Sequence, residues 1–359
     1  MSERSDTATA TPGADARVGT RSPVIRALSR PEIGALIGAV AICCLFLIAA
    51  PAFREAGNIG TILYQTSTIG IMAVPVALLM IGGEFDLSAG VAVPTSALAA
   101  SMIAWQWSFN VWIGVLLALV VSLFIGWFNG WLLHRTRLPS FLVTLGTFFI
   151  LQGVNLAVTR LVAGGVTSPD ISDMQGFDSA QNVFAASHTF FKSSDPHGFE
   201  GINLNITVVF WILLTIIAAI VLLRSRTGNW IFAVGGDADS ARAVGVPVTR
   251  TKTGLFMFVG FCAWLLGMHT LFNFNTVQSG LGVGNEFIYI IAAVVGGCLL
   301  TGGFGSVVGA SVGALIYGMT NLGITYAGWN PDWLKTFLGI MLVVATLINT
   351  WVRRKAEQR

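Results

Sequence analysis

The sequence predicts an all-α polytopic membrane protein with about ten membrane-spanning helices and both termini in the cytoplasm. Hydrophobic residues make up 54% of its 359 residues and charged residues only 10%, whereas soluble domains average about 25% charged residues. The apolar stretches are continuous, while the strands of a membrane β-barrel alternate between apolar and polar residues. A continuous apolar segment in lipid satisfies its backbone hydrogen bonds as a helix, so the composition predicts a helical bundle.

Apolar windows of ~20 residues, the length that crosses a bilayer as a helix, divide the chain into ten segments. The predicted spans are 33–50, 59–81, 88–105, 112–133, 140–159, 204–223, 253–273, 286–301, 306–324 and 334–352.

The basic residues gather on one side of this alternating pattern. If the chain starts in the cytoplasm, sixteen of its twenty Lys and Arg fall at cytoplasmic segment ends. The remaining four are Arg54, Arg160, Lys192 and Lys335. Cytoplasmic loops of membrane proteins are enriched in Lys and Arg. The pattern therefore predicts an N-in, C-in topology, and it explains the net charge of +3 without a nucleic-acid partner.

Two long loops and two tails complete the predicted organisation. Residues 1–32 are expected to form a disordered cytoplasmic tail, and no signal-peptide cleavage site follows it. Residues 33–352 form the membrane domain, which an exterior loop at 160–203 and a cytoplasmic loop at 224–252 interrupt. Residues 353–359 form a basic cytoplasmic tail.

The loop at 224–252 carries the marks of a short, well-capped helix. Asp237 is a favourable N-cap, Asp239 suits the first turn, and Gly245 permits the left-handed turn that ends a helix. Pro247 prevents the helix from resuming. Such a helix between two membrane spans indicates either a docking element or a plain amphipathic connector.

Polar residues near or within the spans are candidates for a gate or a transport pathway. In the turn Gly82–Ser88, Glu84 and Asp86 lie between long apolar runs, where a carboxylate needs an interface or a wet cavity. Asp86 or Ser88 is expected to cap the following helix, and the carboxylates could equally hold a gate against a neighbouring helix. The other candidates are Gln65, Asn129, Gln152, Asn155, Asn273, Asn275, Glu286 and Asn321. Neutral amides suit a hydroxyl-rich solute such as a sugar, although each amide alone is typical of helix–helix contacts.

Glycines at four-residue intervals predict close helix packing. Gly305, Gly309 and Gly313 are expected to form a stripe along one helix face, where a neighbouring backbone approaches closely. By contrast, no residues have the spacing of a nucleophile–base set, a phosphate loop or a metal site. The four cysteines and His269 are interpreted as packing or hydrogen-bonding residues. We therefore expect that this chain catalyses no reaction by itself.

Four sequence segments resemble the permeases of bacterial ABC importers for ribose- and xylose-type simple sugars. The segment Gly82–Gly90 (GGEFDLSAG) is similar to that family's Gly-Gly-x-Asp-Leu-Ser-x-Gly signature, with one additional residue before Asp86. Leu142–Gly153 (LVTLGTFFILQG) and Phe232–Val246 (FAVGGDADSARAVGV) resemble two further motifs. Gly284–Gly313 (GNEFIYIIAAVVGGCLLTGGFGSVVGASVG) resembles the most distinctive stretch of the family. The four motifs occur in the family's order.

The resemblance implies a permease domain in the bacterial cytoplasmic membrane, with the fold of a type II ABC importer. It implies a dimer of identical or paralogous permease subunits, two cytoplasmic ATPase subunits that hold ATP and Mg²⁺, and an extracytoplasmic sugar-binding protein. This chain itself would bind no cofactor and no metal. The residues implied to couple it to the ATPase are Gly236, Asp237, Asp239, Arg242 and Gly245.

Two other functions stay open at this point. Permeases for branched-chain amino acids share the broader fold, so the solute could be an amino acid rather than a neutral sugar or polyol. An ion-coupled secondary transporter would work without an ATPase and would need a membrane-embedded coupling carboxylate.

Overall fold

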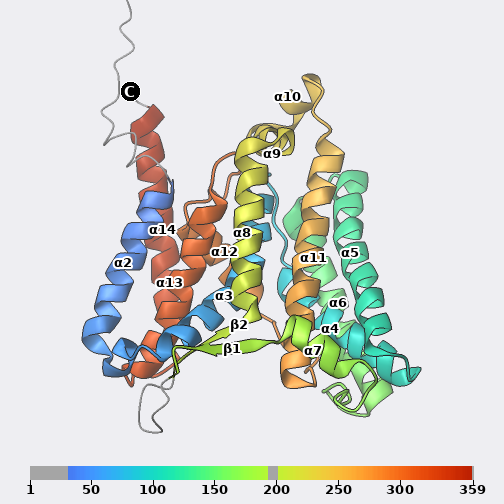
Figure 1. Ribbon diagram of the computed structural model, residues 1–359. Coiled ribbons are helices and arrows are strands. Elements are labelled where there is room, and N and C mark those ends of the chain that lie inside the picture. Colours follow the sequence, from blue (N-terminus) through green and yellow to red (C-terminus); the bar gives the residue numbers. More distant parts are fainter. Residues whose placement is uncertain (1–30, 193–200, 358–359) are drawn as a thin grey trace, which may run out of the picture.

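The computed structural model describes residues 31–192 and 201–357, which form a bundle of helices with one small two-stranded sheet (Figure 1). Residues 1–30 of the predicted N-terminal tail lie outside the described residues, as do residues 193–200 of the predicted exterior loop. The helices in chain order are α2 (Pro31–Ala49), the 3-10 helix η1 (Pro51–Arg54), α3 (Asn58–Ile81), α4 (Ala89–Gln106), α5 (Val111–Thr136), α6 (Ser140–Ala163), α7 (Phe177–Phe184), α8 (Ile206–Arg224), α9 (Arg226–Gly236), α10 (Ala238–Ala243), α11 (Val248–Phe274), α12 (Asn285–Val295), α13 (Val307–Tyr326) and α14 (Trp333–Glu357).

Every predicted span overlaps a helix, but the helices differ in length and polarity. In the described part, α2, α3, α5, α6, α8, α11 and α13 are the seven that are long and apolar enough to cross a membrane. The segment Trp333–Ile348 of α14 is a shorter apolar stretch. Helix α4 has 18 residues but is less apolar, because it includes Pro94, Thr95, Ser96 and Ser101.

Helices α3 and α11 form the centre of the bundle. Most of α3 from Ile69 to Ile81 is buried, as is most of α11 from Leu255 to Phe272. Helix α11 packs against α3, α4 and α5, while α13 packs against α2, α3 and α12. Helices α5 and α8 expose apolar side chains along their outer faces. This arrangement suits a membrane protein, in which lipid solvates the outside and small residues bring the inner helices together.

The predicted span 286–301 is wrong in its second half. Helix α12 ends at Val295 after 11 residues, and an irregular segment containing Gly297, Gly302 and Gly303, all with positive φ, follows it. Glycine adopts this left-handed backbone region without the steric cost that a Cβ brings. An 11-residue helix spans about 16 Å, roughly half of a bilayer core.

The predicted glycine stripe is correct for Gly309 and Gly313 and wrong for Gly305. A Cβ at Gly309 would overlap the carbonyl oxygen of Gly296, and one at Gly313 would overlap that of Ala292, so both positions face α12 and its end. Gly305 precedes the helix, because Ser306 is the N-cap of α13 and accepts a hydrogen bond from the Gly309 amide at 3.2 Å.

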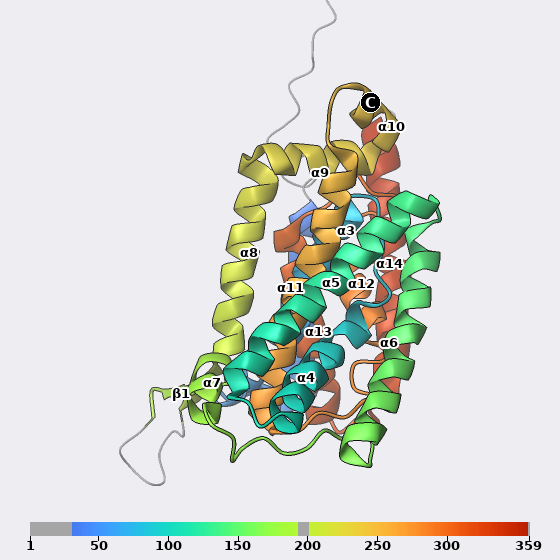
Figure 2. The same ribbon diagram turned by 90° about the vertical axis from the view of Figure 1, so that its right-hand side faces the viewer.

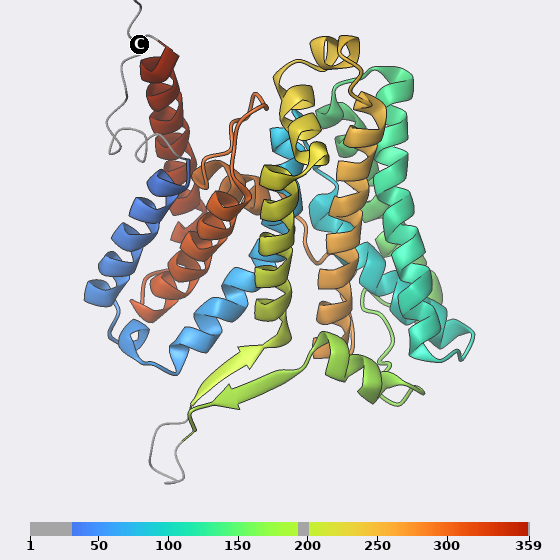
Figure 3. The same ribbon diagram turned by 45° about the horizontal axis from the view of Figure 1, so that its top comes forward.

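The predicted exterior loop contains ordered structure that the all-α prediction omits. Helix α6 continues to Ala163, α7 follows, and strands β1 (Ser187–Phe190) and β2 (Ile202–Asn205) pair antiparallel. The hairpin projects from the end of the bundle opposite α10, as the tilted view shows (Figure 3). His269 of α11 ties this end together: its Nδ1 lies 2.9 Å from the Phe184 carbonyl oxygen and its Nε2 3.1 Å from the Tyr64 hydroxyl. The structural role predicted for His269 is confirmed.

Candidate functional site

Residues 224–252, which were predicted to form a cytoplasmic loop, contain two consecutive helices, α9 and α10, at one end of the bundle. Ser225 caps α9, accepting a hydrogen bond from the Gly228 amide at 3.2 Å, and α9 then lies across the ends of the membrane helices (Figure 2). Helix α10 follows directly and forms the outermost point of this end. Helix α10 was predicted from the sequence, whereas α9 was not. The sequence features that could have indicated α9 are the N-cap Ser225 and the buried apolar residues Ile231 and Val234.

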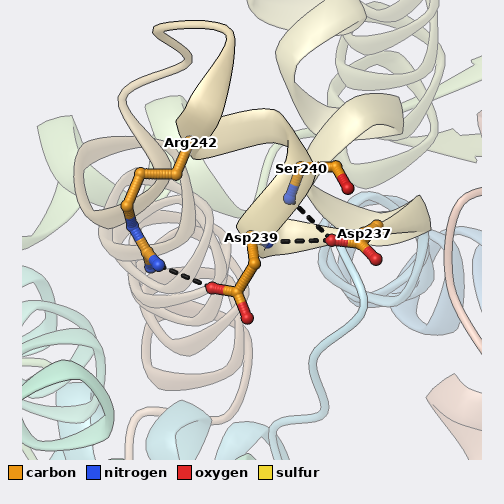
Figure 4. Close-up of polar contacts among 4 residues, drawn as sticks. All are labelled: Asp237, Asp239, Ser240 and Arg242. Atoms are coloured by element: carbon orange, nitrogen blue, oxygen red, sulfur yellow. Dashed lines mark hydrogen bonds and ion pairs between the residues drawn. The ribbon is translucent and has the colours of Figure 1, made fainter.

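The predicted cap of α10 is confirmed. One carboxylate oxygen of Asp237 accepts hydrogen bonds from the amides of Asp239 at 3.0 Å and Ser240 at 2.7 Å (Figure 4). The bonds from Ser240 are the main cause that lowers the pKa of Asp237 below its usual value. The Asp237 cap is therefore ionised throughout the neutral pH range.

The other end of α10 also follows the prediction. Gly245 has a φ of +86°, the left-handed conformation that ends helices, and its amide donates to the Arg242 carbonyl oxygen at 3.0 Å. Arg242 forms an ion pair with Asp239 at 2.6 Å (Figure 4). Both side chains are largely exposed, so the pair contributes little to stability and leaves charged groups available to a partner.

Apolar contacts hold α10 on the bundle while part of it faces outward. Ala241 packs with Val234 of α9 and Val248 of α11 in a small buried cluster. Val244 directs its side chain the other way and is 81% exposed. The outward face therefore combines an exposed apolar residue with the charges of Asp239 and Arg242, which suits a protein contact.

Three pairs of consecutive glycines meet directly beneath α10. They are Gly82–Gly83 after α3, Gly235–Gly236 at the end of α9 and Gly302–Gly303 before α13. The Gly303 amide donates to the Ile81 carbonyl oxygen at 2.8 Å, and a Cβ at Gly302 would come within 2.7 Å of the Gly83 Cα. A Cβ at Gly235 would overlap the Ile81 carbonyl oxygen. A side chain therefore does not fit at Gly235 or Gly302, and the end of α9 lies directly on the turns that follow α3 and α12.

The turn after α3 is built around Asp86, which is buried. Its carboxylate accepts hydrogen bonds from the backbone amide of Ser88 at 2.8 Å and from the Ser88 hydroxyl at 2.5 Å. The Ser88 side chain makes no cap hydrogen bond to α4. Ser88 holds the N-cap position without a side-chain cap bond, and Asp86 instead fixes the turn just before α4 through its bonds to Ser88.

Asn129 extends this turn into a chain of buried hydrogen bonds across three helices. Its Nδ2 donates to the Ser88 hydroxyl at 3.0 Å, and its Oδ1 accepts from the Thr147 hydroxyl of α6 at 2.7 Å. Two further bonds join the turn to α6, from the Phe85 amide to Ser140 and from the Leu87 amide to Thr144, each 3.1 Å long. Because every member has a partner, the network fixes the position of the α4 N-terminus against α5 and α6.

Glu84 forms an ion pair with Lys252 in the first turns of α11. The two side chains are 10% and 12% exposed, respectively. This pairing was not predicted from the sequence, in which Lys252 is the last residue of the predicted cytoplasmic loop 224–252. A lysine four residues after the start of an apolar helix was the signal, because its charge at that depth needs a partner.

The remaining pathway candidates come from several different helices. Gln65 lies on α3, Gln152 and Asn155 on α6, Asn273 on α11 and Asn321 on α13. Asn275 adopts a positive φ of 61° at the end of α11. Asn155 is buried, and its Nδ2 has no hydrogen-bond partner in the described part of the chain. Glu286 is buried at the start of α12, where its carboxylate oxygens lie 3.0 and 3.1 Å from the Gly284 amide, which donates to them.

Metal chemistry finds no support in the described residues, since His, Cys, Asp and Glu form no group of three that could hold an ion there. The site thus consists of a surface helix and the turns beneath it.

Comparison with known proteins identifies the family. Residues 58–346 match the family described as "Branched-chain amino acid transport system / permease component". The chain is 28% identical over 306 residues to the fructose import permease protein FrcC of Rhizobium meliloti, covering 85% of this chain and 81% of that protein. It is also 28% identical over 323 residues to the ribose import permease protein RbsC of Escherichia coli K12, covering 89% and 93%. A third relative, the galactose/methyl galactoside import permease protein MglC of Haemophilus influenzae, is 28% identical over 311 residues, covering 84% and 88%. No solved structure matches the chain.

The matched region includes eight of the ten predicted spans in full and most of the last one, and only the first span, 33–50, lies outside it, so the chain belongs to this permease family. It is a multi-pass membrane protein and a transport subunit rather than an enzyme.

Proposed function

We propose that this chain forms the membrane pathway of an ATP-driven importer for a neutral sugar or polyol. The observation that carries the proposal is the similarity to the fructose, ribose and galactose import permeases, each of which aligns with at least 84% of the chain. The buried side chains of the candidate site agree with it, because hydroxyls and amides predominate there and the charged Lys252 is paired with Glu84.

In this proposal the chain crosses the membrane ten times, through α2–α6 without interruption, then α8, and finally α11–α14, with both termini inside. The short α12 completes its pass through the glycine-rich segment 296–306. Helix α10 would be cytoplasmic, and the β1–β2 hairpin would face the extracytoplasmic sugar-binding protein. The positions of the basic residues support this orientation, since Arg135, Arg224, Arg242 and Arg250 all lie at the α10 end of their helices.

Helix α10 would be the element that couples the permease to a cytoplasmic ATPase. Its outward face carries Asp239, Arg242 and Val244, while α9 connects it to the paired-glycine contact beneath. A push on α10 would thereby reach the turn that carries Glu84 and Asp86. ATP and Mg²⁺ would bind on the ATPase, and two copies or paralogues of this chain would enclose the pathway.

The decisive experiment is uptake by the reconstituted system. The chain should co-purify with an ATPase and, with a sugar-binding protein, should import at least one of ribose, xylose, fructose and galactose in an ATP-dependent manner. ATP-dependent uptake of leucine but of no sugar would favour the alternative hypothesis, a permease for branched-chain amino acids, which the family description suggests. Uptake that needs a proton gradient and no ATP would favour a secondary transporter, with the buried carboxylates Asp86 and Glu286 as its candidates for ion coupling.

A further inference from the structure

Helices α5 and α11 lie side by side (Figure 1). Residues near their α10 ends line a groove between them. It has a volume of about 550 Å³, and its lining includes Trp127, Trp131 and Arg135 from α5 and Arg250, Gly254 and Met257 from α11. None of these residues belongs to the hydrogen-bond network of the candidate site or to α10. The groove is therefore separate from the elements assigned to transport.

The walls of the groove carry residue types that are typical of the boundary between lipid tails and headgroups. Trp127 and Trp131 lie one helical turn apart, their rings stack with centroids 6.1 Å apart, and they are 42% and 44% exposed. Tryptophan is enriched at this level of a membrane because its ring is amphipathic. A Cβ at Gly254 would meet no atom within 4 Å, so the floor of the groove is open at that residue. Deeper in the bundle, Gly126 and Gly130 bring α5 into backbone contact with α11, which closes the inner side.

The mouth of the groove carries two free positive charges. Arg135 and Arg250 are exposed and form no ion pair with any residue in the described part of the chain. Three acidic side chains at this end of the bundle already have other partners: Glu84 pairs with Lys252, Asp239 pairs with Arg242, and Asp237 caps α10. Two unpaired arginines above an apolar, tryptophan-walled groove are complementary to a phosphate group that carries acyl chains.

We propose that this groove binds an anionic phospholipid of the cytoplasmic leaflet. The phosphate lies between Arg135 and Arg250, the glycerol region lies against Trp131, and an acyl chain runs over Gly254 and Met257. The leaflet assignment rests on the orientation given under the proposed function, whereas the chemistry of the ligand does not. A lipid held on the first turns of α11 adjoins the Glu84–Lys252 pair and would link the local membrane composition to the turn beneath α10.

The test uses the full chain purified in mild detergent and mixed with equal amounts of phosphatidylglycerol and phosphatidylcholine. Native mass spectrometry then counts the lipids that each chain retains. The wild type should prefer phosphatidylglycerol, and Arg135→Ala/Arg250→Ala should lower that preference by up to roughly 30-fold, because each arginine near a lipid surface favours anionic lipid about fivefold. Gly254→Leu should displace the acyl chain and reduce retention of both lipids, since open space at this position lets the variant fold.

Arg137→Ala is the matched control, because Arg137 follows the same helix end but does not line the groove. Equal retention of both lipids by the wild type, or an unchanged preference in the double variant, would overturn the proposal. A second measurement tests the competing occupant: if the double variant fails to bind the ATPase in bilayers of pure phosphatidylcholine, the arginines contact the ATPase and the lipid proposal is wrong. Because lipid retention is measured on the isolated chain, a failure of the sugar-import proposal would leave this result unaffected.

Discussion

Glu84 and Lys252 form a nearly buried ion pair that joins the turn after α3 to the first turns of α11, although 168 residues separate them in the sequence. The pair lies beneath the surface helix and beside the glycine contact that seats α9. Backbone contacts thus connect the end of α9, which leads into α10, to the turn that carries Glu84.

Breaking the pair should be costly. Glu84→Gln or Lys252→Met leaves one charge without its partner in a site where the side chains are about 10% exposed, so each should destabilise the protein by about 3–5 kcal/mol. The double variant Glu84→Gln/Lys252→Met should recover much of that loss, because neither charge remains. Thermal unfolding in detergent measures all three variants, and a double variant less stable than either single variant would contradict a simple pairing.

The hydrogen-bond chain through Asn129 gives a second prediction. Asn129→Ala removes the bonds to Ser88 and Thr147 and leaves both hydroxyls buried with fewer partners, which should cost about 1–3 kcal/mol. Asn182 on α7 is exposed, so Asn182→Ala is the control and should unfold at the wild-type temperature. Equal melting temperatures for the two variants would show that the network does not hold α4 in place.

Much of this fold could be predicted from the sequence, because lipid imposes simple constraints. Continuous apolar segments and the distribution of arginines were sufficient to place a helix at each of the ten predicted spans. The capped α10 was also predictable, since Asp237 and Gly245 each bond to backbone groups only two or three residues away. Local interactions of this kind need no knowledge of the tertiary structure.

The partners of the buried polar residues could not be predicted, because they depend on which helices become neighbours. Nothing local to Glu84 indicates Lys252, and nothing in the segment around Asn129 indicates Ser88 on one side and Thr147 on the other. The early end of α12 was missed for a related reason. Apolar residues continue beyond Val295. The irregular segment 296–306 that replaces the expected helix contacts Gly83 and Gly235, which only the folded bundle brings to it.

Close packing of α13 on α12 should make Gly309 intolerant of even one methyl group. Gly309→Ala places a Cβ against the Gly296 carbonyl oxygen, whereas Gly146→Ala on α6 meets no atom within 4 Å. In a helix without a clash, Gly→Ala stabilises by about 0.4–1 kcal/mol. The two substitutions should therefore change the melting temperature in opposite directions, and a stabilising Gly309→Ala would show that α12 and α13 separate more easily than the structure indicates.

The orientation can be tested with single cysteines that replace exposed residues in a background without the native cysteines. A cysteine at Asp239 should react with a membrane-impermeant maleimide only after the cells are opened, while one at Asp178 should react in intact spheroplasts. The basis is that Arg135, Arg224, Arg242 and Arg250 lie at the same end of the bundle as α10, and α7 lies at the other. Labelling of the Asp239 position from outside would reverse the topology and remove the basis for ATPase coupling.

The coupling role of α10 requires that its shape, and not merely its presence, be needed for ATPase binding. Gly245→Val forces a β-branched residue into a φ of +86°, at a cost of about 1–3 kcal/mol of local strain, and should unwind the end of α10. Asp237→Ala removes the two cap bonds, and Arg242→Glu replaces an ion pair with repulsion against Asp239. All three variants should insert into the membrane normally but lose ATPase association and sugar uptake.

Gly164→Val is the matched control. Gly164 ends α6 with a φ of +73° and, like Gly245, has no atom within 4 Å of a Cβ, but it lies at the opposite end of the bundle. This variant should carry the same local strain and still bind the ATPase. Equal losses of ATPase association in Gly164→Val and Gly245→Val would mean that strain anywhere in the bundle, rather than a change in the shape of α10, abolishes coupling.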